Sequence, residues 1–131
     1  MATTWTHTWT RSVKDSGGTA LSTDSETVTG NEDNRLKDVA TAGQTKHISV
    51  GSITKANITS FLIESDQNVT LKINSSTTPD QTISLTAKRA YAWKNTDPSA
   101  NPLSPSTITD LYFVNAGATD ANVTASFLQN N

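Results

Sequence analysis

Short runs in which apolar and polar residues alternate, separated by polar turns, constrain the fold of this chain most. In the segment VTLKIN (residues 69–74), Val69, Leu71 and Ile73 alternate with polar residues. Because successive side chains of a β-strand point to opposite faces, this alternation indicates a strand with one buried face. Similar patterns predict about eight strands, in segments 3–13, 45–53, 58–65, 69–74, 82–86, 90–95, 109–117 and 121–129.

The predicted strands recur along the chain without a segment of helical periodicity between them. Strands spaced by roughly 8–12 residues with polar turns are typical of antiparallel sandwiches and barrels. The chain holds 23 Thr and 15 Ser among 131 residues, and the branched Thr side chain favours strands. We therefore expect an all-β protein, an antiparallel β-sandwich of jelly-roll or Greek-key type with about eight strands. A small closed barrel is the alternative.

The chain length of 131 residues is that of a single domain. Within it, residues 15–44 are largely polar and interrupted by glycine, and we expect a long loop region with at most short strands at 20–21 and 27–29. The segment RLKDVATAG (35–43) is expected to be extended. Compact domains seldom carry long loops without a functional reason, and contact with a partner is the reason we expect. The predicted division is an N-terminal strand or arm at 1–14, the loop region at 15–44 and a sandwich core at 45–131.

Composition excludes several classes of partner and chemistry. The net charge is −2 and the Lys and Arg residues are scattered, so the basic patch that nucleic acids require is missing. The absence of cysteine excludes disulfides, thiolate zinc sites and a cysteine nucleophile. No apolar run approaches the roughly 18–20 residues of a membrane span, and the first residues do not have the pattern of a signal peptide. We predict neither a nucleic-acid nor a membrane partner.

Residues that could carry out catalysis or bind a metal are few. His7 and His47 are the only histidines, and they would form a metal site only if the fold added carboxylates to them. The acidic residues of the 15–44 segment could collect Ca²⁺, but they lack the spacing of an EF-hand loop. They are Asp24, Glu26, Glu32, Asp33 and Asp38. We predict no cofactor, no metal and no enzymatic activity.

Aromatic residues are the remaining candidates for a binding site. In the strand TTWTHTWTRSV (3–13), Trp5, His7, Trp9 and Arg11 share one face, opposite a face of Thr and Ser. Tryptophan is favoured at the centre of protein interfaces, and a terminal strand can also add to the sheet of a neighbour. We therefore predict that these four residues contact a partner. Tyr91 and Trp93 are an alternative platform for stacking on sugar rings, although a place in the core is the simpler interpretation of both.

The second half of the chain resembles small virion proteins of tailed bacteriophages. The similarity lies in SFLIESDQNVTLKINSS, ISLTAKRAYAWKN and ITDLYFVNAGATDANVTASFL, which together span about residues 58–128. The resemblance implies a β-sandwich that decorates or cements a capsid shell, and it brings no catalytic residues with it.

From this resemblance we expect a capsid decoration protein that binds the lattice of the major capsid protein and stabilises the head. Such a protein would be made in the host cytoplasm and located on the capsid surface of the virion. It would also bind itself, as a homodimer or homotrimer. The alternative is a tail or head appendage with a carbohydrate-binding sandwich.

Overall fold

The computed structural model describes residues 4–131, and of Leu21 only the backbone. Residue 3 of the first predicted strand lies outside this range. The elements are the strands β1 (Trp5–Lys14), β2 (Ala20–Gly30), β3 (Glu32–Ala40), β4 (Thr45–Thr54), β5 (Ile58–Ser65), β6 (Val69–Ile73), β7 (Gln81–Leu85), β8 (Tyr91–Lys94), β9 (Thr107–Val114) and β10 (Ala121–Gln129), with one 3₁₀ turn, η1 (Lys55–Asn57).

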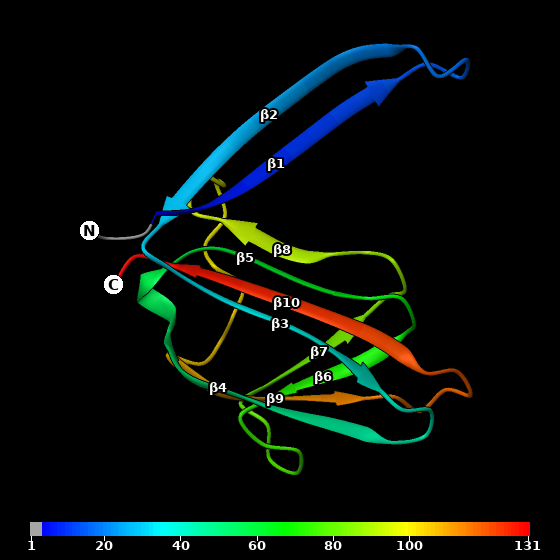
Figure 1. The fold of residues 1–131 in the computed structure, drawn as a ribbon, viewed down its shortest axis with the longest axis vertical. Helices are drawn as coiled ribbons and strands as arrows, with labels where there is room; N and C mark the ends of the chain where they lie inside the picture. The colour runs from blue at the N-terminus through cyan, green and yellow to red at the C-terminus, as the bar shows by residue number, and fades with distance from the viewer. Residues whose placement is uncertain (1–3) are drawn as a thin grey trace.

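The eight strands from β3 to β10 pair like a long hairpin folded over on itself. All the pairings are antiparallel: β3 with β10, β4 with β9, β5 with β8 and β6 with β7. Two further pairings, β5 with β10 and β6 with β9, join these pairs into the sheets β3-β10-β5-β8 and β4-β9-β6-β7. This nested order is that of a jelly roll. The predicted all-β antiparallel sandwich is therefore confirmed, and the two separate sheets rule out the closed-barrel alternative (Figure 1).

The core lies between the two sheets and follows the predicted alternation. In β6, Val69, Leu71 and Ile73 are buried while the residues between them are partly exposed. Phe61, Phe113 and the core-facing residues of β10 are fully buried and complete the core. Burial of these apolar side chains is the main stabilising contribution to the sandwich.

The prediction that residues 15–44 form mainly a loop is wrong. The segment contains β2, which pairs with β1 along its whole length, and β3, which forms an edge of the sandwich. The two short strands expected at 20–21 and 27–29 belong to the single strand β2, whereas the expected extended segment includes the end of β3. The sandwich therefore begins at Glu32 rather than at residue 45.

These strands lack an apolar alternation because neither is buried like the strands of the core. Most side chains of β2 are exposed, and β3 is a sheet edge whose outer face carries charged residues. Backbone pairing with β1 and β10 holds them, and that pairing is not visible in a hydrophobic pattern.

The hairpin of β1 and β2, residues 5–30, is here called the arm. It packs at one end against the outer face of sheet β3-β10-β5-β8 and leans away from the sandwich toward its turn (Figure 1). The turn is closed by Asp15, whose carboxylate accepts hydrogen bonds from the amides of Gly17 and Thr19 at 2.9 and 2.8 Å. Gly18 in this turn has a φ of +87°, a conformation that suits glycine.

Candidate functional site

The arm base, residues 5–9 and 28–30, rests on an apolar contact that lies outside the core between the sheets. Val28 pairs with His7 across the hairpin and so shares its sheet-facing side. Val28 is 5% exposed, and Leu128 on the outer side of β10 is fully buried. A Cβ atom on Gly30 would lie 2.4 Å from the carbonyl oxygen of Gln129. The absence of a side chain at Gly30 therefore lets the arm approach β10 this closely.

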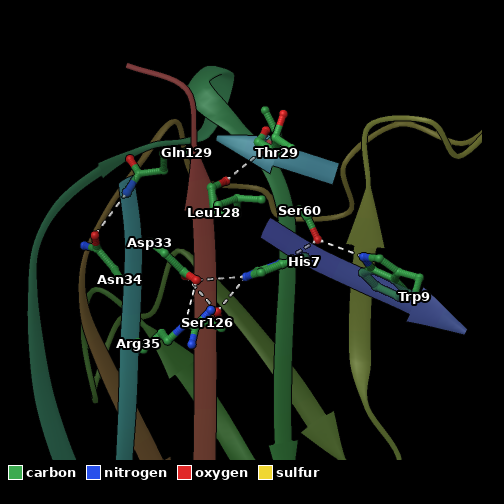
Figure 2. Close-up of polar contacts among 11 residues, drawn as sticks. His7, Trp9, Thr29, Asp33, Asn34, Arg35, Ser60, Ser126, Leu128 and Gln129 are labelled. Carbon is green, nitrogen blue, oxygen red and sulfur yellow. Dashed lines mark hydrogen bonds and ion pairs between the residues drawn. The ribbon is translucent and has the colours of Figure 1, made fainter. Parts of the chain in front are cut away.

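A polar network around His7 connects the arm base to three strands of the sandwich (Figure 2). His7 Nδ1 lies 2.9 Å from Ser60 Oγ of β5, and His7 Nε2 lies 2.8 Å from Ser126 Oγ of β10. The same Nε2 is 3.2 Å from Asp33 Oδ2 of β3. The Trp9 indole N–H donates to Ser60 Oγ at 3.1 Å. One imidazole ring thus joins β1 to β3, β5 and β10.

The geometry of the network assigns its hydrogen atoms. Trp9 donates to Ser60, whose hydroxyl can then donate to His7 Nδ1. A proton on His7 Nε2 donates to Ser126, which donates in turn to Asp33 Oδ1 at 2.8 Å. A neutral imidazole protonated on Nε2 therefore satisfies every member of the network, which buried polar groups require.

The carboxylate of Asp33 is fully buried beneath this network. Burial raises the pKa of Asp33, but hydrogen bonds from Arg35 and Ser126 and the charge of Arg35 outweigh it, so the pKa lies below its ordinary value. The Arg35 guanidinium donates to Asp33 at 2.6 Å and lies 5.2 Å from the ring centroid of Trp5. It therefore connects the carboxylate to the first residue of β1.

A second cation contacts the arm base from β8. Lys94 Nζ lies 5.2 Å from the ring centroid of Trp9 and forms ion pairs with Asp97 at 2.6 Å and with Glu26 of β2 at 3.6 Å. The hydrogen bond to Asp97 raises the pKa of Lys94, so the ammonium stays charged against the indole.

The four residues predicted to contact a partner do not share one environment. His7 and Trp9 face the protein's own sandwich and are half-buried there. Trp5 retains 38% exposure, whereas the side chain of Arg11 is 80% exposed and is paired with Asp24. The alternation in the sequence therefore continues along β1 past the part of the strand that packs on the sandwich.

The arm tip, residues 10–25, extends into solvent. Every side chain from 10 to 20 and from 22 to 25 is exposed, on both faces of the hairpin. Val13 is the most exposed large apolar residue among those that the structure describes, at 60%. A two-stranded hairpin exposed on both faces is at best marginally stable in water.

Tyr91 and Trp93 lie on the core-facing side of β8. Their ring centroids are 5.8 and 6.5 Å from that of Phe61, and both side chains are half-buried. The Trp93 indole N–H donates to the carbonyl of Ser99 at 2.9 Å. The two rings therefore pack at the border of the core rather than forming a flat exposed platform.

Trp93 also lines a hollow of about 400 Å³ together with Lys55, Asn101 and Ser106. The buried Nδ2 of Asn101 has no hydrogen-bond partner within residues 4–131.

The histidines and acidic residues considered as metal ligands have other contacts. His47 stacks on Tyr112 with a centroid distance of 4.4 Å and bonds Asp110 at 2.7 Å, on the sheet opposite to that of His7. No three His, Cys, Asp or Glu side chains within residues 4–131 form a group that could hold a metal ion. Five acidic side chains have the following contacts: Asp24 with Arg11, Glu26 with Lys94, Asp33 with Arg35, Asp38 with Lys46, and Glu32 with the amide of Asn131.

The cluster of His7, Asp33 and two serines does not have the geometry of a nucleophilic triad. Such a triad places the serine and the carboxylate on opposite nitrogens of the ring, with the serine open to substrate. Here Ser126 and Asp33 share Nε2, and Ser60, on Nδ1, has no exposed surface. The arrangement holds the arm on the sheet.

In the part of the chain that the structure describes, no helix is long and apolar enough to cross a membrane. Comparisons of the chain with protein-family models, with curated proteins and with solved structures found no match.

Proposed function

We propose that this protein is a capsid decoration protein of a tailed bacteriophage and that its arm attaches it to the shell. The observation that carries the proposal is the arm itself, whose base is bound to the jelly roll while its tip meets only solvent. A projecting hairpin of marginal intrinsic stability gains order when a partner covers it. We propose the major capsid protein as that partner, on the resemblance of residues 58–128 to small virion proteins.

Decoration in this proposal works by mass action. A protein that binds only the assembled shell stabilises it by RT ln(1 + [L]/Kd) at each site, and the effect is repeated over the lattice. A homodimer or homotrimer on a symmetry axis would add avidity, because its arms would be linked. This mechanism uses no catalytic group, no cofactor and no nucleic acid. In this proposal the protein is made in the host cytoplasm and lies on the outside of the virion.

The test is co-sedimentation with expanded shells of the major capsid protein encoded in the same genome. We expect the protein to sediment with the shells and to raise the temperature at which they disrupt. A charged residue at the arm tip, in Val13→Asp, should reduce binding at least tenfold without changing the melting temperature of the protein. Val39→Asp is a matched control, because Val39 is also an exposed valine on a strand, at 42%. The proposal fails if the wild type does not bind, or if the two variants bind equally well.

Carbohydrate binding by a tail or head appendage is the second candidate function. It is favoured by the hollow beside Trp93, which Lys55 and Asn101 also line. Sugars are bound by this combination of ring stacking and hydrogen bonding, in pockets lined by apolar and a few polar groups. A glycan array would show binding that Trp93→Ala and Asn101→Ala both abolish. Absence of binding across the array would leave the decoration role as the better account.

A further inference from the structure

A groove lies between β1 and the outer face of sheet β3-β10-β5-β8. Its volume is about 790 Å³. On the arm side it is lined by the five consecutive residues 6–10, so both faces of β1 take part. On the sheet side the lining includes Leu62, Ala90 and Thr124. The arm diverges from the sandwich toward its turn (Figure 1).

β1 turns an unpaired edge toward this groove. Within residues 4–131, β1 is paired only with β2, and no β2 residue lines the groove. In an antiparallel pair every second residue directs its N–H and C=O away from the partner strand. Residues 6–10 therefore offer a row of free backbone groups about 17 Å long, which another strand can use.

The charge of the groove differs from that of the whole protein. Arg35 and Lys37 lie along its sheet side and are exposed, and the lining contains no Asp or Glu. The protein as a whole has a net charge of −2. The buried carboxylate of Asp33 pairs with Arg35, so Lys37, which forms no ion pair within residues 4–131, is the cation left for a partner. The groove is therefore complementary to a segment with carboxylates.

We infer that this groove binds an extended, carboxylate-bearing segment of another polypeptide, which adds to the free edge of β1 as a third strand. Main-chain hydrogen bonds to β1 would supply affinity, and contacts with Leu62 and Lys37 would supply selectivity. The identification of that segment with part of a shell subunit rests on the proposed function. The groove itself needs only a partner with this chemistry.

The test uses two labelled seven-residue peptides of alternating character, TVDVDVT and TVKVKVT, added to the isotope-labelled full chain. We expect the acidic peptide to shift the backbone amide signals of residues 6–10 and to bind at least five times more tightly than the basic one. Thr124→Trp, which fills the sheet side of the groove, should abolish the shifts. Thr70→Trp on the outer face of the other sheet is the matched control and should bind as the wild type does.

The charge contribution has its own pair of variants. Lys37→Glu should weaken binding of the acidic peptide about threefold, as expected for one exposed ion pair. Lys72→Glu makes the same charge change on the opposite sheet and should have no effect.

Several results would overturn the inference. They are equal binding of both peptides, no shift at residues 6–10 up to 5 mM peptide, shifts confined to the edges of β4, β7 or β8, or unimpaired binding by Thr124→Trp. A dimer in the absence of peptide with protected amides at 6–10 would also overturn it, because a second copy would then fill the groove. Peptide binding without any shell binding would refute the decoration role alone. Shell binding that Thr124→Trp leaves intact would refute only the identification of the bound segment with part of a shell subunit.

Discussion

The two halves of β1 carry the same alternation but have opposite environments. From Trp5 to Trp9, the face with the large side chains is held on the sandwich by hydrogen bonds and by two cations. From Arg11 to Val13, the same face meets only solvent. The comparison teaches that alternation identifies the face of a strand but not what covers it. In the arm base the protein covers its own strand, whereas the side chains of the arm tip are exposed.

Removing apolar volume beneath the arm base should have the largest effect. Leu128→Ala deletes a fully buried side chain and leaves a cavity, which costs about 2–4 kcal/mol of unfolding free energy. Val13→Ala deletes apolar atoms that are already exposed in the arm tip and should cost less than about 0.5 kcal/mol. Urea unfolding followed by circular dichroism measures both. Similar losses for the two variants would mean that the base and the tip do not differ as described.

Deleting the imidazole of His7 in the arm base should have the second-largest effect on stability. His7→Ala removes one hydrogen-bond partner from each of Ser60, Ser126 and the buried Asp33, and the loss of a partner to a buried polar group costs about 1–3 kcal/mol. His47→Ala is the control, because His47 also contacts an aspartate but is 49% exposed. We expect the control to lose less stability. In the His7 variant, amide exchange should also accelerate throughout the arm, whereas unchanged exchange there would argue against the role of His7 in holding it.

The buried carboxylate of Asp33, beneath the arm base, predicts that the free energy of unfolding depends on pH. The pKa of Asp33 in the folded protein lies below its ordinary 3.8, so the unfolded chain binds the proton more tightly. Ionised Asp33 therefore stabilises the protein above about pH 4, and this contribution is lost as the pH falls through the folded-state pKa. The difference in unfolding free energy between the wild type and Asp33→Asn should shrink between pH 6 and pH 3. A constant difference for Asp33→Asn would contradict the assignment.

The sandwich could be predicted from sequence where strands bury one face. β6 shows why, since Val69, Leu71 and Ile73 are buried and the residues between them are not. β2 and β3 could not be predicted in this way, because backbone pairing rather than apolar burial holds them. Their polar composition is also typical of loops.

The candidate site was predictable only in part. The face of Trp5, His7 and Trp9 followed from the period of two, but its contact with the sandwich depends on residues far away in the chain. Ser60 and Ser126 are the examples, because a serine in an apolar strand gives no sign of the ring that it binds. An isolated polar residue in a strand otherwise suited to the core, as in SFLIES, is the signal that would have indicated a covered outer face.

Breaking the ion pair of the arm tip should have the smallest effect on stability. It therefore tests most directly whether the arm tip opens independently of the arm base. Arg11 and Asp24 are paired at 3.0 Å, with side chains 80% and 62% exposed. Exposed pairs contribute little, so Arg11→Ala should change the unfolding free energy by less than about 0.5 kcal/mol. The local opening of the hairpin should still increase, because the side chains of the tip are exposed, and amide exchange at Thr10 and Ser25 would report this. Faster exchange that also reached Thr6 and Val28 would show that the tip and the base open together, and the division between them would then be wrong.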